Sequence, residues 1–560
     1  MYSKGKNLIK IKMILVNAEQ QNLTTITQEL NINNITATVN FNYLSEENSE
    51  DKTTKHPNNI LYIPEKVKEK LEQTLSQNPP NFSVKNQTDY FIYIIHLLYD
   101  IPAKNRNIDL CNSNGFVPVY KQLLKKKVDE YPKYLNYLVE NDIVEKGRNH
   151  RAGFNSSELR VNPSLVSNIV PVEINKTTLI KSINKFHDVS RYYKPKEVNT
   201  DTTLVSDTIT STNTINYPYL NMYFNDKLKI NTEQAYKYLE LFEAEEMDKI
   251  MKYKTKATIN KKIIKIINKL NVFKYQINYL NQGNFYNSVD DNVGRYNSIL
   301  TNIKSELRNY ITYNNQRLYP IDVVSSQPYF SISLLNIELF EQNKMEQRIR
   351  KFWKQNNVNK KEIYNNNNII YNKQSEIGNN IIMIRNYIKE NQNTKDVLEY
   401  KNLILSGNFY EKFAEYILDE YQDKKFKNND SRKYAKMALL KTIYADEKIE
   451  KYGEYIPIFK KHFPTVYKLF NLIKDNGKQH HLLACIMQNL EAETLLDKTC
   501  GELSNDYPDI PLFTIHDSII TTKEYIEPVK EALTKNLFKV VGEYPNFKVE
   551  CWEDEKIELS

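Results

Sequence analysis

The stretch Ser431–Glu447 reads SRKYAKMALLKTIYADE, has the period of a helix and decides how the rest of the chain is interpreted. Residues four apart lie on one helical face. The row on that face is Arg432, Lys436, Leu440 and Tyr444. A second, small and apolar stripe is Ala435, Ala438, Leu439 and Thr442. Two cations one turn apart suit the oxygens of a triphosphate, and an aromatic two turns further on can lie against a base. Taken alone, the stretch also fits a solvated amphipathic helix.

The composition is that of a globular protein with several cores. The chain has 560 residues, of which 40% are hydrophobic and 26% charged, enough for about three or four domains. The net charge of +8 fits a nucleic-acid partner. However, the chain has only 12 Gly but 41 Tyr, and Asn, Ile and Lys are abundant. This bias indicates AT-rich coding, so part of the lysine excess carries no functional meaning.

The cysteines and the apolar runs favour an intracellular protein. The four cysteines have neither metal-ligand nor CxxC spacing and are Cys111, Cys485, Cys500 and Cys551. The longest apolar run, Tyr90–Ile101, contains His96 and Asp100 and predicts a buried helix rather than a membrane span. The N-terminal IKIKMILVNA is a poor signal peptide because lysines interrupt it. We expect a location in a host cytoplasm or organelle matrix, no secretion and no membrane partner.

The N-terminal half carries weaker signals. Residues 1–60 are Asn- and Thr-rich and predict a poorly patterned segment, either partly disordered or a β element. Residues 61–195 are mainly helical, with a predicted helix over Ile60–Ile101 whose buried stripe is Tyr90, Ile94, Leu97 and Leu98. Residues 196–230 read as a linker, although their β-branched residues also allow a hairpin. Residues 231–290 predict basic, thumb-like helices that could grip a duplex or simply be solvated.

Residues 115–165 have the order of a winged helix. Val117–Lys125 and Tyr131–Asn141 are predicted helices, and DIVEKGR and AGFNSSELRVNP, over 142–148 and 152–163, are predicted strands joined by a basic turn. This order is typical of a DNA-binding unit, but winged helices also serve as protein-interaction domains or connectors.

Four further stretches accompany the opening helix. In chain order they are Asp291–Arg308 with Gly294-Arg295, Leu318–Leu335 with Asp322, Met487–Leu496 with Gln488, and Leu512–Thr522 with His516-Asp517. Leu318–Ile321 predict a strand that delivers Asp322 at its end, and Pro328 suits the first turn of the next helix. Leu512–Thr522 predict a β-hairpin with the His-Asp pair at its bend. Each stretch alone is common by chance, so the interpretation rests on all five stretches occurring together in this order.

Taken together, these motifs resemble the polymerase core that family A DNA polymerases share with phage-type single-subunit RNA polymerases. The motifs that carry the resemblance are GR…LTNIK, DVVSSQP, RKYAKMALLKTIYA, QNLEAE and IHDS, and they cover about Ile250–Ser560. The spacing of Arg432, Lys436 and Tyr444 matches the fingers-helix motif of that family. Residues 1 to about 230 lie outside the resemblance and show no 3′–5′ exonuclease signature. The implied fold is α+β, a right-hand core with an antiparallel palm sheet and helical fingers and thumb, over residues 291–560 with an Asn-rich insertion at 340–400.

The resemblance implies template-directed nucleotidyl transfer with two Mg²⁺ ions, for which Mn²⁺ is a possible substitute. Asp322 and Asp517 would be the metal ligands, because Mg²⁺ prefers carboxylate oxygens and keeps waters, and their mutual repulsion would favour metal entry. The implied nucleotide-binding residues are Arg432, Lys436, Tyr444 and Gln327, with Lys436 also protonating the pyrophosphate. The implied primer-template contacts are Arg295, Gln488 and His516, with Arg295 and Gln488 in the minor groove.

Departures from the family pattern leave the sugar preference open. Ala445 stands where Gly is usual after the Tyr, and Leu440 and Ser518 resemble the RNA polymerases. Gln327 stands where the DNA polymerases usually carry a Glu that blocks the ribose 2′-OH, and it has nearly the same shape. We therefore expect a DNA-directed DNA polymerase, with a single-subunit RNA polymerase or primase as the alternative. The AT-rich coding and small core suggest a phage, plasmid or other mobile element.

Three other interpretations compete with an active polymerase, and one of them, a plain structural protein, would leave the five ordered motifs as coincidence. Tyr444-Ala445-Asp446-Glu447 resembles the YxDD box of reverse transcriptases, but that box needs a hairpin and this one follows a helical pattern. A non-catalytic DNA-binding or replication-initiation protein on a polymerase scaffold would have no need for Asp322, Asp517, Arg432 and Lys436 together.

Overall fold

The computed structural model describes residues 25–32, 35–42, 59–82, 88–105, 108–110, 112–147, 157–184, 217–253, 255–290, 292–357, 367–421, 431–444, 455–474 and 479–553. The chain divides into two compact units, Met1–His56 and Pro57–Ser560. In the first unit, β1 (Thr25–Ile32) pairs antiparallel with β2 (Ile35–Asn42), with Thr25 opposite Asn42. The described part of this Asn- and Thr-rich segment is therefore a β-hairpin. Of the predicted linker over 196–230, residues 196–216 lie outside the described residues, and the described remainder contains a short helix, Pro218–Asn221, and a strand, Leu228–Ile230.

The N-terminal part of the second unit is built around a buried helix, α3 (Thr88–Lys104). Its other helices are α2 (Glu65–Gln77), α4 (Lys121–Lys127), α5 (Tyr131–Glu140), α6 (Thr177–Asn184) and the short η1 (Pro163–Leu165). Strands β3 (Ile60–Pro64) and β7 (Ile169–Glu173) pair with each other. Strands β4 (Val117–Val119), β6 (Ser157–Val161) and β5 (Val144–Lys146) form an antiparallel sheet in that order.

Two predicted helices of this region begin later than the sequence pattern indicated. Ile60–Pro64 is a strand, because it pairs with β7. Val117–Val119 is likewise a strand, because it pairs with β6, and the helix starts only at Lys121. Both segments carry apolar residues whose periodicity fits a short buried strand as well as a helix. The predicted helix over Tyr131–Asn141 and the two strands after it are confirmed as α5, β5 and β6.

Two long helices follow, α9 (Thr232–Ile250) and α10 (Lys256–Asn281), and they pack against each other. Each begins at a residue whose side chain caps it, because Asn231 accepts a hydrogen bond from the Gln234 N–H and Thr255 from that of Thr258. α10 also packs on α3. The predicted helical pair over 231–290 is thus present.

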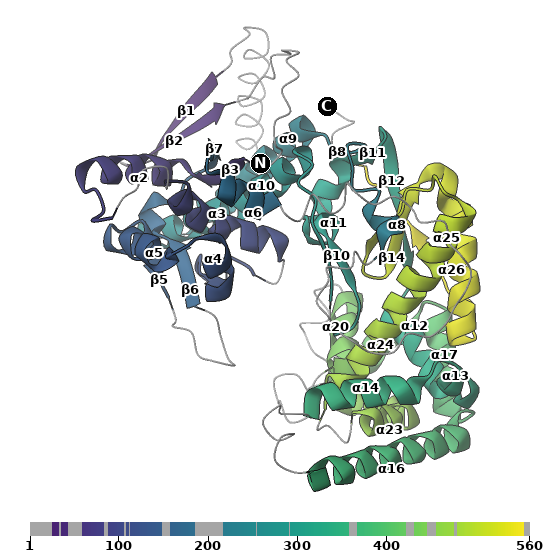
Figure 1. The fold of residues 1–560 in the computed structure, drawn as a ribbon. Coiled ribbons are helices and arrows are strands. Elements are labelled where there is room, and N and C mark those ends of the chain that lie inside the picture. The colour runs from purple at the N-terminus through teal and green to yellow at the C-terminus, as the bar shows by residue number, and fades with distance from the viewer. Residues whose placement is uncertain are drawn as a thin grey trace. The chain divides into compact units, whose positions relative to one another are not determined.

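The central sheet of the second unit is antiparallel and has the strand order β13-β14-β12-β11-β8, with β15 also paired to β12 (Figure 1). Its strands are β8 (Leu228–Ile230), β11 (Ile311–Tyr313), β12 (Gln316–Val323), β13 (Phe513–Ile515), β14 (Ser518–Thr522) and β15 (Phe547–Val549). Helix α26 (Ile526–Val541) packs on β12 and β14. A separate hairpin pairs β9 (Asn287–Val289) with β10 (Tyr296–Ser298). The fold is therefore mixed α+β.

Helices make up the remainder of this unit. Those before the predicted insertion and within it are α8 (Pro218–Asn221), α11 (Ile299–Asn302), η2 (Ser305–Tyr310), α12 (Ser326–Ser331), η3 (Ile332–Leu335), α13 (Ile337–Gln342), α14 (Met345–Asn357), α16 (Asn367–Asn391) and α17 (Lys395–Leu405). Those after it are α18 (Phe409–Tyr421), α20 (Ser431–Tyr444), α22 (Ile456–His462), α23 (Pro464–Ile473), α24 (Leu482–Ala492), the π-helical η4 (Glu493–Cys500), α25 (Gly501–Asp506) and η5 (Lys523–Tyr525).

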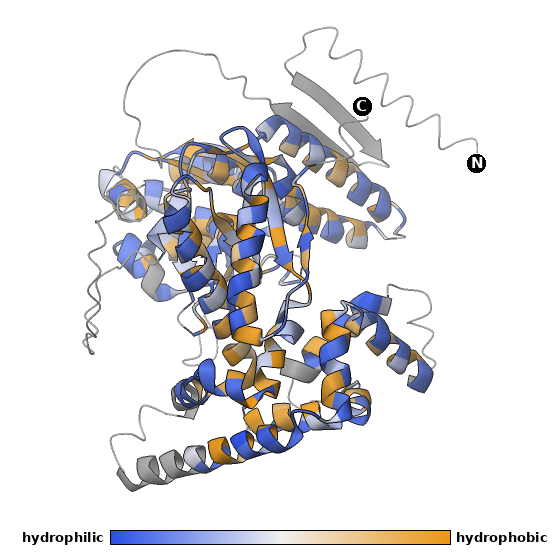
Figure 2. Ribbon diagram, turned by 90° about the vertical axis from the view of Figure 1, so that its right-hand side faces the viewer, coloured by the Kyte–Doolittle hydropathy of each residue, from blue (hydrophilic) through white to orange (hydrophobic). Residues whose placement is uncertain are grey.

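The described part of the Asn-rich insertion at 340–400 consists largely of helices that pack against other helices of this unit. α14 packs on α24 and α16 packs on α23. In Figure 2, the coloured part of α16, the long helix at the bottom, carries both hydrophilic and hydrophobic residues, as expected for a helix with one buried face. Among the residues that the structure describes, no helix combines the length and the apolarity needed to cross a bilayer.

Candidate active site

Two aspartates lie beside each other at one end of the central sheet, one within a strand and one in the turn before the neighbouring strand. Asp322, the penultimate residue of β12, stands opposite Ser518, the first residue of β14. Asp517 precedes Ser518 in the β13–β14 turn, and its carbonyl oxygen accepts a hydrogen bond of 3.3 Å from the Val323 N–H. The strand that ends near Asp322 and the hairpin with Asp517 at its bend are both confirmed. The structure thus brings together two side chains that are far apart in sequence.

The two turns beside these aspartates have unusual backbone conformations. His516, at φ 52°, and Ser325, at φ 53°, both adopt the left-handed region. Ile515 pairs with Ser518, so the chain must reverse over His516 and Asp517 alone. A left-handed residue other than glycine costs about 1 to 2 kcal/mol, and such residues concentrate at functional sites.

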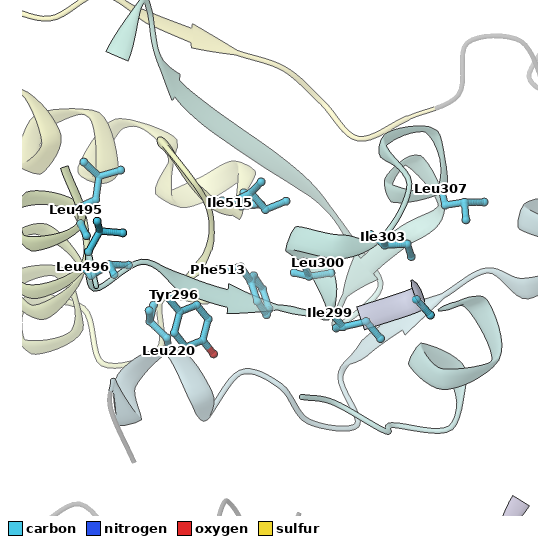
Figure 3. Close-up of a cluster of buried hydrophobic side chains, with 14 of the residues drawn as sticks. Leu220, Tyr296, Ile299, Leu300, Ile303, Leu307, Leu495, Leu496, Phe513 and Ile515 are labelled. Carbon is cyan, nitrogen blue, oxygen red and sulfur yellow. The ribbon is translucent and has the colours of Figure 1, made fainter. Parts of the chain in front are cut away.

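A buried apolar cluster holds the β13–β14 turn in place. Figure 3 shows Phe513 and Ile515 of β13 in a cluster with Tyr296 of β10, residues of α11 and residues of η4. The Phe513 ring makes edge contacts with Phe224 and Tyr313, at centroid distances of 5.4 and 5.6 Å. The strand that leads into Asp517 is therefore fixed by close packing, which a site needs if its geometry is to be constant.

The electrostatics of the aspartate pair favour a bound cation. Burial raises the pKa of Asp517 to about 6, and the carboxylates of Glu491 and Asp322 add to this rise, whereas the Lys436 ammonium opposes it. Burial also raises the pKa of Asp322, while the Ser518 hydroxyl opposes the rise. Like charges held together away from water are relieved by a cation, so the pair has the character of a metal or cation site.

Glu491 of α24 is a functional candidate that the sequence did not single out. Its side chain is only 1% exposed. It accepts hydrogen bonds from Arg295 Nη2 at 2.5 Å, Ser326 Oγ at 2.7 Å and Gln327 Nε2 at 2.5 Å. Glu491 belongs to the QNLEAE motif and lies three residues after Gln488, which puts the two on neighbouring positions of one helical face, but the motif gave it no role.

Arg295 reaches Glu491 from the turn between β9 and β10. Asp290 shapes this turn by accepting hydrogen bonds from the N–H groups of Asn292 and Val293. Gly294 has φ 78°, a conformation that glycine adopts without strain. The structure thus brings Arg295 and Gln327, two of the predicted site residues, to one buried carboxylate.

The described side chains of α20 agree in part with the two predicted faces, since Leu440 is half-buried and the side chains of Thr442 and Tyr444 lie outside the described residues. Ala435, Ala438 and Leu439 are buried, and the helix packs on α18, α22 and α24. On the other face Arg432 and Lys436 are exposed. Arg432 donates a hydrogen bond of 2.7 Å to Glu411 of α18, and its guanidinium lies 5.3 Å from the centre of the Tyr410 ring. Because Arg432 and Glu411 are both about half exposed, their ion pair is weak and can exchange for a stronger anion.

The remaining predicted residues are placed less fully. Gln488 lies in the second half of α24, not near its start, and is half-buried. His516 lies in the turn beside Asp517. Tyr444 is the last residue of α20, and its side chain lies outside the described residues, as does all of Ala445–Glu447. The structure therefore tests neither the aromatic at the end of the row nor the YxDD-like segment.

The donor set suits a hard cation that keeps part of its water shell. Within the described ranges, no group of three or more His, Cys, Asp and Glu side chains is arranged to hold a metal ion. Mg²⁺ is commonly bound through one or two carboxylates, several waters and the phosphates of a substrate. Asp322 and Asp517 fit that requirement, and the cations of α20 lie on the helix that approaches them.

Comparison with known proteins adds no relative to this geometry. No protein-family model matches the sequence, and no curated protein matches it significantly.

Proposed function

We propose that this protein is a template-directed nucleotidyltransferase, a DNA-directed DNA polymerase that extends a primer with nucleoside triphosphates. The observation that carries the proposal is the meeting of Asp322, Asp517 and Lys436. Two partly buried carboxylates lie at the end of one sheet, and a cation from a separate helix acts on one of them. Nucleotidyl transfer requires these components, because charge develops on the attacking and leaving oxygens.

The residues of α20 have a clear part in this proposal. Arg432 and Lys436 bind the triphosphate, with Arg432 exchanging Glu411 for phosphate oxygens. Lys436 also supplies a proton to the leaving pyrophosphate. Asp322 and Asp517 would hold Mg²⁺, which would supply charge neutralisation for the transfer. Tyr444, the last residue of α20, is proposed to contact the base of the incoming nucleotide.

Arg295 is the best-supported contact to the primer-template. Its Nη2 is bound to Glu491, while its Nε is buried and makes no hydrogen bond within the described part of the chain. The Arg295 side chain is 25% exposed, and the exposed part of its guanidinium can donate to a minor-groove acceptor, which every base pair presents. Gln488 and His516 are proposed to contact the primer end as well.

The helical pair α9 and α10 is proposed to be the thumb. The β4–β6–β5 sheet, together with α4 and α5, is proposed to be a winged helix within a recruitment region. The order α3, β4, α4, α5, β5, β6 supports this second assignment. The proposed substrates, DNA and nucleoside triphosphates, place the reaction inside a cell.

An RNA polymerase or primase is the second candidate, favoured by Ser518 and Leu440. The test is primer extension on a DNA template with Mg²⁺, with dNTPs and rNTPs offered separately. Asp517→Ala is the test variant and Asp509→Ala, at an exposed position before β13, is the control. Extension with dNTPs that Asp517→Ala alone abolishes is expected. Extension with rNTPs alone would move the assignment to the second candidate. Duplex binding without extension would leave a non-catalytic DNA-binding protein.

A further inference from the structure

We propose that Glu491 is a positioning residue that fixes Gln327 and Arg295 and thereby sets which nucleotide sugar the site accepts. The inference rests on the proposed function, since it concerns the selectivity of that site. Glu491 belongs to α24, Gln327 and Ser326 to α12, and Arg295 to the β9–β10 turn. One buried carboxylate therefore ties together three elements that are distant in sequence.

The contacts of Glu491 are those of an orienting group. Gln327 Nε2 and Ser326 Oγ both bond to Oε2, and Arg295 Nη2 bonds to Oε1. A bond from Nε2 fixes which end of the Gln327 amide faces Glu491, because the other end of the amide carries only an acceptor. Bonds to an ionised acceptor are also short and strong, so the amide is held rigidly.

Holding the Gln327 amide in one orientation matters because of where Gln327 lies. Gln327 follows Ser325, the left-handed residue that ends the turn after Asp322. Glu491 is close enough to Asp517 to raise the pKa of that aspartate. Gln327 contacts Glu491 and lies five residues after Asp322 in the sequence, which places it at the border of the proposed nucleotide site. A small displacement of such a side chain changes whether a 2′-OH fits, and site geometry must hold to about 0.5 Å.

Arg295 joins the same carboxylate to the proposed duplex contact. The guanidinium and Gln327 share one partner, so a shift of either side chain changes the position of the other. Glu491 is thus placed to link a well-formed primer-template with the shape of the nucleotide site.

The neighbouring Glu493 provides a matched control on the same helical segment. Its carboxylate pairs with Arg348 and, at 3.1 Å, with Lys498, and no hydrogen bond to Gln327 is recorded for it in the described structure. Glu493→Gln removes one negative charge beside an arginine, as Glu491→Gln does. Any general effect of charge loss on this helix is therefore shared by both variants.

The test compares kcat/KM for a dNTP with that for the matching rNTP, at one template position, in the full-length protein. Glu491→Gln is expected to reduce the dNTP preference by about 10- to 100-fold, which corresponds to one charge-assisted hydrogen bond, while Glu493→Gln keeps the wild-type ratio. The double variant Glu491→Gln with Gln327→Glu reverses donor and acceptor in the same bond and is expected to restore the preference.

Thermal unfolding of each variant shows whether a loss of folding accounts for its kinetics. An unchanged ratio in Glu491→Gln, an equal change in Glu493→Gln, or no restoration in the double variant would overturn this inference alone. Absence of extension by the wild type would overturn the proposed function, and this inference with it.

Discussion

Asp322 stands directly opposite Ser518 in the pairing of β12 with β14, and this register holds Asp517 beside it. Two carboxylates are thus kept together where burial disfavours both charges. Stability alone would not select this arrangement, since like charges in a partly buried place oppose folding. A protein retains such a pair where it serves a function, and four predictions follow from the account of this site and its surroundings.

Asp517→Asn is expected to stabilise the metal-free protein by about 1 kcal/mol, because it removes the like-charge repulsion and part of the burial cost. Urea denaturation at neutral pH with a chelator measures this change. The same variant should lose primer extension. A loss of both stability and extension would indicate that Asp517 is a structural turn residue.

Arg432→Ala and Lys436→Ala are each expected to raise the KM for the nucleotide about tenfold, through the loss of a charged contact to phosphate. Lys436→Ala should also lower kcat, because Lys436 is proposed to protonate the pyrophosphate. Both side chains are exposed, so the free energy of unfolding should change by less than about 0.5 kcal/mol. Steady-state kinetics with a fixed primer-template provide the measurement. Lys433→Ala, an exposed cation of the same helix, is the control, and an equal effect of this variant would contradict the assignment.

Arg295→Met is expected to lower the free energy of unfolding by about 3 kcal/mol, because Glu491 would remain buried without its cationic partner. Combining it with Glu491→Gln should cost less than the sum of the two single changes. Arg385→Met, which removes an arginine from an exposed pair with Glu341, should cost less than about 1 kcal/mol. Equal losses in both arginine variants would show that the buried pair has no special role.

A buried chain of hydrogen bonds between α3 and α10 predicts a pH dependence. The Tyr62 N–H donates to His96 Nδ1 at 3.1 Å, so the proton of the neutral ring lies on Nε2, 3.1 Å from the Tyr275 hydroxyl. That hydroxyl donates in turn to Asp100, which also pairs with Lys104 at 2.6 Å. Burial lowers the pKa of His96 from 6.5 to about 4, against the opposing charge of Asp100.

Below pH 6.5 the His96 side chain therefore binds a proton in the unfolded chain but stays neutral in the folded chain. The contribution of His96 to stability is complete above pH 6.5 and is lost as the pH falls toward 4, by up to about 3 kcal/mol. Urea denaturation at several pH values measures this, with His96→Gln as the comparison. Parallel pH profiles for the wild type and the variant would refute the assignment.

The local parts of the site could be predicted from the sequence, whereas its connections could not. Short patterns of apolar residues predict the local elements, namely the strand before Asp322, the hairpin around Asp517 and the buried stripe of α20. Glu491 did not stand out, because its partners Arg295 and Gln327 lie 196 and 164 residues away. The apolar residues of Val117–Val119 also fit a helix, which is why a helix was predicted there. The segment is a strand because it pairs with β6, a tertiary contact that its local sequence does not reveal.

The most direct test of the central claim is to identify the nucleotide that is added first on four templates differing only in the base opposite the incoming position. Wild type, Asp322→Asn and the control Asp509→Asn are compared with Mg²⁺ and all four dNTPs. The account predicts the complementary nucleotide on each template for the wild type and the control, and no addition by Asp322→Asn. Addition that ignores the template base, or that persists in Asp322→Asn, would contradict template-directed transfer at this site.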